Sequence, residues 1–508
     1  MNTSAPHQTS LNHRSSCLLL LALAVLSAFL SGCAVFFPNS RPSDPLEGLR
    51  YDISRVLSDS IFVQARPSIK VISLESKEVL FERDSKLLMR PASNMKLVTS
   101  ASALGVLGKN YIFKTPVLAD TPATDGVLNR NLYLKGLANP DLVTSDLDSL
   151  AGLVKSAGIK NVAGGVCADV SFFDDVYWGS GWIWDDEPYS YAPFLSSLAV
   201  NDNCVVVTVT PGASAGDSVR VVVDPPTSYI TVLNKARTVQ DSVLHPLVVT
   251  RLFKEHLNTI LVEGEMRTTS NPAEHTLSVW KPEVYAATLF SEALQRKGIA
   301  VAQSPSVGTA PASSHEIASL SHGIDSTIVN MNKVSDNLSA EMLLKTLGTT
   351  NGGAPGSTEG GVSVAHKFLS TLGIDTTKFN MVDGSGLSFY DLLTTEMISQ
   401  LLEGMARQKD LFPLYRESLP IAGVDGTLRN RMKKTPAEGN LRAKTGTISG
   451  VSSLSGYVQT LDGETLVFSM TMQNFMYPTR LYQRAQDKIG ALLAGFSRIG
   501  RTASLPSK

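Results

Sequence analysis

The stretch Pro-Ala-Ser-Asn-Met-Lys-Leu-Val-Thr-Ser-Ala-Ser-Ala-Leu, residues 91–104, carries the most information in the chain. Apolar residues at helical spacing follow Pro91, a residue that favours the first turn of a helix, so we predict a helix here. A spacing of three places Lys96 beside Ser93 on one helix face. A serine hydroxyl needs an adjacent base to act as a nucleophile, and a desolvated amine loses its proton more easily. The pair therefore predicts a nucleophile, Ser93, with a lysine base, Lys96.

The same spacing also occurs at Ser278 and Lys281, so the pattern by itself has little specificity. Pro282 follows directly, and a residue that precedes proline is disfavoured in a helical conformation. We therefore predict that Ser278 and Lys281 do not share a helix face and have no catalytic role.

A second motif, Ser335-Asp336-Asn337, stands before a helical segment. A hydroxyl and a carboxamide two residues apart can both face a cleft from a turn. All three residue types are also common helix N-caps, so a purely structural cap is the alternative interpretation.

A third motif, Lys444-Thr445-Gly446-Thr447, lies in a predicted strand. The two threonines would project to one face of that strand, and Gly446 would let a substrate backbone come close. An exposed edge strand without a catalytic role is the alternative.

Together and in this order, the three motifs resemble the signature of serine β-lactamases and penicillin-binding proteins. Two further segments, Asp-Gly-Ser-Gly-Leu-Ser at 383–388 and Gly-Val-Asp-Gly-Thr-Leu at 423–428, are similar to motifs of the low-molecular-mass class C penicillin-binding proteins, the D-alanyl-D-alanine carboxypeptidase/endopeptidases. The resemblance runs from about residue 49 to 496. Roughly 240 residues separate Ser93 from Ser335, which matches the large insert of that family and exceeds the spacing in class A β-lactamases.

The resemblance implies acyl transfer from peptidoglycan stem peptides, with β-lactams as inhibitors. Ser93 would attack the carbonyl of the penultimate D-alanine with Lys96 as base, and the N–H groups of Ser93 and Thr447 would form the oxyanion hole. Ser335 and Lys444 would relay a proton to the leaving amine. Asn337 would hold the substrate amide. The substrate's terminal carboxylate would lie against Thr445, Gly446 and Thr447.

The resemblance is incomplete near Asn139, where the family often has Gly-Asp-Pro, and at Phe389, where it commonly has arginine. Residues 181–186, Gly-Trp-Ile-Trp-Asp-Asp, are similar to a family loop whose acidic residue faces the diamino acid of the stem peptide. This similarity implies that Asp186 binds substrate, and a structural aspartate in a Trp-rich turn is the alternative.

The texture of the chain predicts a mixed α/β domain that is split by a β-rich insert, and the resemblance implies that this domain is a catalytic domain of the penicillin-binding type. Alternating residues at 68–81 predict a hairpin, and helical periodicity predicts helices at 284–297 and 395–408. β-Branched runs dominate from about 113 to 276. We therefore expect catalytic segments at 48–110 and 281–498, an insert of one or two lobes at 111–280, and a tail at 499–508.

The N-terminus has the features of a secretory signal. Basic residues precede an apolar run of about 14 residues, which is shorter than the ~20 needed to span a bilayer. The sequence Leu-Ser-Gly-Cys at 30–33 resembles a lipobox. It implies a signal peptide at 1–32, lipidation of Cys33, a tether at 33–47 and a periplasm-facing location in the bacterial envelope. Ala34 favours the outer membrane. An ordinary signal peptide is the alternative.

With those cysteines assigned, Cys167 and Cys204 remain. An oxidising compartment permits a disulfide between them, and two free thiols are the alternative.

Composition excludes several other classes of protein. The 508 residues include 45 Lys+Arg and 46 Asp+Glu, a balance that argues against a nucleic-acid partner. No His-Glu-x-x-His motif is present, and the Gly-rich stretch at 351–361 lacks the Gly-Lys-Ser/Thr of a phosphate loop. We predict no metal and no cofactor. A β-lactamase or esterase on the same scaffold, or a non-catalytic wall-binding lipoprotein, are the alternative functions, and the intact motif residues argue against the latter.

Overall fold

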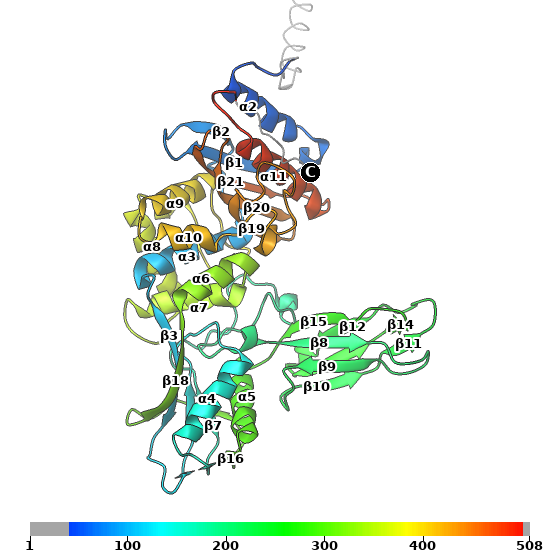
Figure 1. The fold of residues 1–508 in the computed structure, drawn as a ribbon, viewed down its shortest axis with the longest axis vertical. Coiled ribbons are helices and arrows are strands. Elements are labelled where there is room, and N and C mark those ends of the chain that lie inside the picture. Colours follow the sequence, from blue (N-terminus) through cyan, green and yellow to red (C-terminus); the bar gives the residue numbers. More distant parts are fainter. Residues whose placement is uncertain (1–39, 501–508) are drawn as a thin grey trace, which may run out of the picture.

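The structure is a computed structural model, and it describes residues 40–500 (Figure 1). The predicted signal peptide, Cys33 and most of the tail lie outside the described residues. Within residues 40–500, no helix is long and apolar enough to cross a membrane.

The catalytic domain is built on a five-stranded antiparallel sheet with the order β19-β20-β21-β1-β2. The strands are β1 (Arg66–Ser73), β2 (Val79–Arg83), β19 (Arg442–Ile448), β20 (Val451–Gln459) and β21 (Thr465–Gln473). Antiparallel pairing of β1 with β2 confirms the predicted hairpin. Because both faces of the sheet are covered, β20 is buried along nearly its whole length. The C-terminal motif strand β19 occupies the edge of the sheet.

Helices cover the two faces of this sheet. On one face, α2 (Pro45–Val56) packs against α11 (Thr479–Ala494), which contacts β20. The other face supports a helical region made of α3 (Met95–Leu107), α6 (Ile324–Val334), α7 (Asn337–Thr349), α8 (Thr358–Thr371), α9 (Thr395–Arg407) and α10 (Phe412–Ser418). Most of α3 is buried on all sides, as expected for a helix at the centre of a core.

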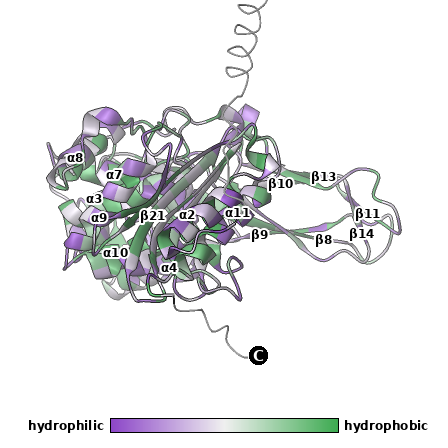
Figure 2. Ribbon diagram, turned by 90° about the horizontal axis from the view of Figure 1, so that it is seen from above, coloured by the Kyte–Doolittle hydropathy of each residue, from purple (hydrophilic) through white to green (hydrophobic). Residues whose placement is uncertain are grey.

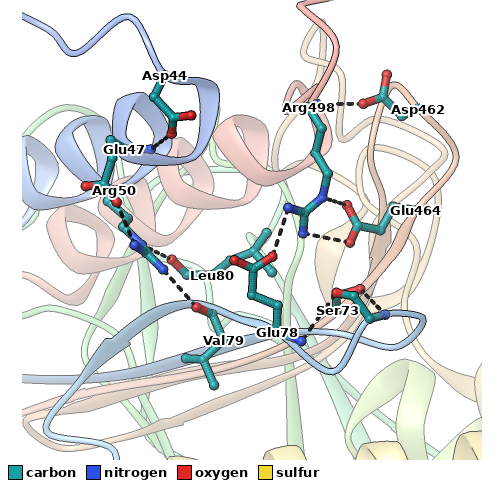
Figure 3. A network of polar contacts seen from close by, with 11 residues as sticks. Asp44, Glu47, Arg50, Ser73, Glu78, Val79, Leu80, Asp462, Glu464 and Arg498 are labelled. Atoms are coloured by element: carbon teal, nitrogen blue, oxygen red, sulfur yellow. Dashed lines mark hydrogen bonds and ion pairs between the residues drawn. The ribbon is translucent and has the colours of Figure 1, made fainter.

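Arginine side chains fasten both ends of the catalytic domain to the β2 edge of the sheet (Figure 3). Arg50 of α2 donates to the carbonyl oxygens of Leu80 and Val79, at 2.9 and 3.1 Å. Arg498 pairs with Glu78 and Glu464, each at 2.9 Å. The segments before β1 and after α11 therefore belong to the same folded unit.

The insert leaves the catalytic domain through β3 (Ile112–Ala119) and returns through β18 (His315–Gly323). These two strands pair antiparallel, with Ile112 opposite Gly323. They belong to a five-stranded sheet with the order β17-β7-β5-β3-β18, which includes β5 (Leu132–Lys135), β7 (Val166–Asp169) and β17 (Ser306–Val307). Helices α4 (Thr144–Ser156) and α5 (Pro282–Arg296) pack on this lobe, and a small sheet is formed by β4 (Val127–Leu128), β6 (Asn161–Val162) and β16 (Ala300–Val301).

The predicted boundary between residues 280 and 281 is therefore wrong. The predicted helix at 284–297 exists as α5, but its buried residues Phe290 and Leu294 share a core with the lobe strands. The catalytic domain resumes at α6. The lobe is also more helical than predicted, since α4 and α5 belong to it.

The remainder of the insert forms an arm that projects from the molecule (Figures 1 and 2). Its three small sheets contain β8 (Cys204–Thr210), β9 (Arg220–Asp224) and β15 (Ala273–Ser278); β10 (Thr231–Asn234), β12 (Val248–Arg251) and β13 (Thr259–Glu263); and β11 (Arg237–Val239) with β14 (Glu265–Arg267). The insert thus has two lobes.

Cys167 and Cys204 are both buried free thiols, so the disulfide that the sequence permitted is not formed. Cys167 lies in the lobe strand β7, whereas Cys204 begins the arm strand β8 in a different sheet. Each thiol faces its own carbonyl acceptor, Gly308 at 3.6 Å for Cys167 and Asp202 at 3.2 Å for Cys204.

The insert contacts the catalytic domain through a small apolar cluster that includes Trp182, Leu338 and Met342. Trp182 is buried there, and its indole N–H donates to the buried carboxylate of Asp383 at 3.0 Å. An ion pair between Lys345 and Asp174 adds a second link across this interface. The insert is therefore fixed against the catalytic domain close to α7 and residues 383–388.

Candidate active site

The predicted nucleophile lies where a 3₁₀ turn, Ala92–Asn94, runs into α3. Lys96, one turn along, places Nζ 3.1 Å from Ser93 Oγ, as the spacing of three predicted. The turn is held against β20 because Ser453 Oγ donates to the Pro91 carbonyl oxygen and the Asn94 amide donates to Ser455 Oγ, both at 2.7 Å. Ser93 is thus presented on a rigid support.

Lys96 is fully buried, and its ammonium is surrounded by oxygen acceptors. Besides Ser93, it donates to Asn337 Oδ1 at 2.5 Å and to the Ser385 carbonyl oxygen at 2.8 Å. Burial lowers the pKa of Lys96 to about 8, although the charges of Asp336, Asp383 and Glu341 act in the opposite direction. A neutral amine is therefore accessible near physiological pH, as a general base requires.

The Ser-Asp-Asn motif fulfils both interpretations that the sequence allowed. Asp336 is the N-cap of α7, where its carboxylate accepts from the N–H groups of Leu338 and Ser339. Ser335 ends α6 in a left-handed conformation, with φ of 68°. This reversal leaves Ser335 and Asn337 on the site side of the cap. The Asn337 amide donates to the Tyr191 carbonyl oxygen at 2.5 Å, which ties the motif to the insert.

The Lys-Thr-Gly motif lies on the edge strand β19, beside the turn of Ser93. Lys444 is buried and donates to Ser335 Oγ at 2.8 Å. Burial, with the nearby charge of Lys96, holds the pKa of Lys444 well below its ordinary value. The hydroxyl of Thr445 pairs with that of Thr427 at 2.8 Å. The motif therefore does lie on an edge strand, as the alternative interpretation predicted. That strand also brings Lys444 and Thr447 to the cavity region.

Gly446 has a packing role that the sequence did not predict. A Cβ on this residue would meet Ser453 Oγ at 2.1 Å, the Pro91 carbonyl oxygen at 2.8 Å and the Ser93 nitrogen at 3.0 Å. The space that the absent side chain leaves is therefore filled by the nucleophile turn and by Ser453. Its absence of a side chain lets β19 pack directly against Ser93.

A cavity of about 390 Å³ opens over these residues. It is lined by Ser93, Ser335, Asn337 and Thr447 from the motifs, by Ile183, Asp186 and Tyr191 from the insert, and by Gly386, Leu387, Phe389, Ile448 and Ser449. Lys96 and Lys444 are buried behind the residues that line the cavity. Thr445 and Gly446 do not line the cavity. The structure thus gathers most of the predicted site residues around one space.

Asp186 lies at the end of a short 3₁₀ turn, Trp184–Asp186, on the insert side of the cavity. Its Oδ1 accepts from the Tyr191 hydroxyl at 2.8 Å. Phe389, the departure from the family pattern, also lines the cavity, and the Arg90 guanidinium lies 4.7 Å above its ring. Position 389 thus holds phenylalanine where the family commonly has arginine, and the guanidinium of Arg90 lies beside it instead.

Sequence analysis missed the support that holds the Lys96 acceptor. Buried Glu341 of α7 accepts from the backbone N–H groups of Gly384 and Ser385, which positions the Ser385 carbonyl oxygen on Lys96. Burial and the charge of Asp383 raise the pKa of Glu341 to about 8. Tyr191, Ser385 and Thr427 were missed as well, because they contribute backbone carbonyls or a single distant hydroxyl that leave no motif.

Other serines with catalytic-looking spacing lie outside the site. Ser278 ends β15 and donates to the Glu187 carbonyl oxygen, while Lys281 has a left-handed φ of 54°, so the prediction that they share no helix face is confirmed. The stretch Gly-Ala-Ser-Ala-Gly at 212–216 joins two antiparallel strands of the arm and is no strand-to-helix nucleophile elbow.

Comparisons with known proteins agree with this geometry. The D-Ala-D-Ala carboxypeptidase 3 (S13) family matches residues 49–494. A D-alanyl-D-alanine carboxypeptidase of Actinomadura sp. (strain R39) is 36% identical over 468 residues, covering 89% of this chain and 85% of the relative. D-alanyl-D-alanine carboxypeptidase DacB of Haemophilus influenzae is 27% identical over 399 residues, covering 78% of this chain and 83% of the relative.

Among solved structures, penicillin-binding protein 4 of Haemophilus influenzae has the same fold, with a TM-score of 0.76 at 24% identity over 86% of this chain and 97% of that one. A second structure of that protein, complexed with a β-lactam, gives a TM-score of 0.71 at 23% identity over 86% and 98% of the two chains. The predicted fold class is confirmed. The chain belongs to the D-Ala-D-Ala carboxypeptidase 3 (S13) family of class C low-molecular-mass penicillin-binding proteins and is a serine-type hydrolase.

Proposed function

We propose that this protein is a D-alanyl-D-alanine carboxypeptidase/endopeptidase that acts on peptidoglycan stem peptides and their crosslinks through an acyl-enzyme on Ser93. One observation carries the assignment of roles. Ser93 Oγ lies 3.1 Å from Lys96 Nζ, and Ser335 Oγ lies 2.8 Å from Lys444 Nζ, so two serine–lysine pairs border one cavity. One pair can activate the nucleophile while the other supplies a proton to the leaving group.

In the acylation step, neutral Lys96 takes the hydroxyl proton of Ser93 as Oγ bonds to the carbonyl carbon of the penultimate D-alanine. The N–H groups of Ser93 and Thr447 face the developing oxyanion, and one such donor contributes ~3 kcal/mol to the transition state. The carbon–nitrogen bond then breaks, and Ser335 and Lys444 relay the proton that Lys96 took from Ser93 to the departing amine, which leaves Lys96 neutral again. Water hydrolyses the ester and regenerates Ser93.

The remaining predicted residues recognise the substrate in this proposal. Asn337 holds the substrate amide, and the terminal carboxylate lies near Thr445, Gly446 and Thr447. Asp186, on the insert side of the cavity, faces the amine of the stem-peptide diamino acid. A β-lactam resembles D-alanyl-D-alanine and would acylate the same serine.

Labelling with a fluorescent penicillin tests the nucleophile. We expect covalent label on the wild type and none on Ser93→Ala. Ser278→Ala, the control for the second Ser-x-x-Lys sequence, should be labelled like the wild type. Label that persists on Ser93→Ala would exclude Ser93. Digestion of purified muropeptides then measures carboxypeptidase and endopeptidase products separately, and rapid release of hydrolysed penicillin would favour a β-lactamase.

We also propose a place in the bacterial cell envelope, with the chain attached to the outer membrane by lipid on Cys33. The apolar N-terminal run and its Leu-Ser-Gly-Cys end support this proposal. Globomycin, which blocks lipoprotein signal processing, should cause the precursor to accumulate. Normal processing in its presence would exclude lipidation of Cys33.

A further inference from the structure

A second and larger hollow, about 870 Å³, adjoins the catalytic cavity. The two spaces share three lining residues, Tyr191, Ser335 and Asn337. Beyond them, the larger space extends between the Ser335–Asn337 turn, the start of α4 at Thr144 and the turn before β8 at Asp202. We call this space the interdomain cleft. It is continuous with the site on the side of Ser335, the residue proposed to protonate the leaving group.

The wall of the cleft carries carboxylates that have no cationic partner. Its Asp148 is paired with Arg296 at 2.9 Å, and its Asp336 is engaged in capping α7. Asp202 and Asp224 differ, because in residues 40–500 neither carboxylate has a hydrogen-bond or ion-pair partner. Desolvation by the surrounding protein, with the charges of Asp336 and Asp141, raises the pKa of Asp202, whose side chain is exposed to the cleft. A carboxylate in such surroundings favours a cationic ligand.

The turn that carries Asp202 is firmly held. Asn201, Asp202 and Asn203 all have left-handed φ angles, between 51° and 55°. The Asn201 side chain accepts from the Thr144 N–H at 3.0 Å, and the Asn203 side chain donates to the Phe194 carbonyl oxygen at 2.8 Å. The two flanking amides therefore fix the backbone and leave the carboxylate between them to line the cleft.

We propose that the interdomain cleft receives the second stem peptide of a crosslinked substrate, the amine-bearing peptide that leaves during acylation, and that Asp202 faces a cationic group of that peptide. This inference rests on the proposed function. Cleavage breaks the carbon–nitrogen bond next to Ser335, so the departing peptide extends away from Ser93 on the Ser335 side. An uncrosslinked substrate releases only D-alanine at this place, which leaves the cleft unused.

The experiment compares two substrates on Asp202→Asn. Asparagine adopts left-handed φ readily and matches aspartate in size, so the turn is retained. We expect kcat/KM for a purified crosslinked muropeptide dimer to fall about tenfold, which corresponds to ~1.4 kcal/mol of lost binding. For an uncrosslinked pentapeptide, kcat/KM should change less than about twofold. Asp202→Lys should reduce dimer cleavage further, and Asp241→Asn, on the exposed arm, should change neither reaction.

The possible failures are distinct. Equal losses on both substrates, or an unchanged rate on the dimer, would overturn the cleft assignment while leaving the proposed function intact. A wild-type enzyme that binds penicillin but cleaves neither substrate would refute the proposed function itself.

Discussion

Lys96 can accept a proton from Ser93 only when its own amine is neutral. Its pKa of about 8 means that the ammonium form predominates at lower pH. Below pH ~8, each unit of decrease in pH lowers the neutral fraction about tenfold. We therefore expect the second-order rate of penicillin acylation to rise with pH and to level off near pH ~8. Rates that are flat or falling between about pH 6 and 8 would contradict Lys96 as the base.

Asp186 and its neighbour Asp185 allow a matched test of substrate recognition. Asp186 lines the catalytic cavity, whereas Asp185 is exposed outside it. If Asp186 binds the amine of the stem peptide, Asp186→Asn should raise KM for an amine-bearing stem peptide by about three- to tenfold, the cost of losing one partly desolvated ion pair.

The controls for this test are internal. Penicillin, which lacks that amine, should acylate Asp186→Asn at the wild-type rate, and Asp185→Asn should behave as wild type with both. An equal loss of activity toward penicillin and peptide would instead indicate that the loop is disturbed. The cause would be the lost hydrogen bond from the Tyr191 hydroxyl to Asp186.

At the residue scale, the reactive side chains of the site could be predicted from sequence motifs, whereas the backbone groups that contact them could not. Ser93, Lys96, Ser335 and Lys444 belong to short spacings that sequence displays directly. The acceptor on Lys96 is a carbonyl of Ser385, nearly 300 positions away, and any residue type supplies a carbonyl. Only the tertiary fold brings such a group to the site.

At the scale of elements, the contact of β19 with the nucleophile turn should be sensitive to a single methyl group. Gly446→Ala would place Cβ 2.1 Å from Ser453 Oγ and 3.0 Å from the Ser93 nitrogen, so the strand or the turn must shift. We expect penicillin acylation to slow at least about tenfold, since small displacements of catalytic groups have costs of this order or larger. Gly152→Ala, in α4 where a Cβ meets nothing within 4 Å, is the matched control. Wild-type acylation by Gly446→Ala would contradict this account.

Periodicity located the elements but not their partners. The helix predicted at 395–408 is α9, Thr395–Arg407, because its apolar face repeats clearly. The helix predicted at 284–297 is equally real, yet it covers the insert core and not the catalytic one. A repeating apolar face indicates that a helix packs on something, and the identity of that surface depends on strand pairings far apart in sequence, such as β3 with β18.

At the scale of the whole molecule, one buried hydrogen bond helps to join the insert to the catalytic domain. Trp182→Phe keeps the ring in the interface but removes the donor to Asp383. The Asp383 carboxylate keeps its donors Ser385, Gly386 and Ser388. Losing one hydrogen bond costs about 1 kcal/mol, so the free energy of unfolding in urea should fall by about that amount. Trp184→Phe, in the same loop and 64% exposed, should change the free energy of unfolding by less than ~0.5 kcal/mol. Equal midpoints for the two variants would show that the interface does not need this bond.

The pairing of Ile112 with Gly323 has a consequence for how such a molecule can be assembled and altered. From the side of the catalytic domain, the whole insert begins and ends at neighbouring positions, as the tip of a hairpin does. The lobe and arm can thus be exchanged or lengthened as one module without changing how the chain connects the elements that carry Ser93 and Lys444. Tyr191 and Asp186 would go with the module. The motif residues of the catalytic domain and the insert residues that line the cavity therefore lie in separable parts of the chain.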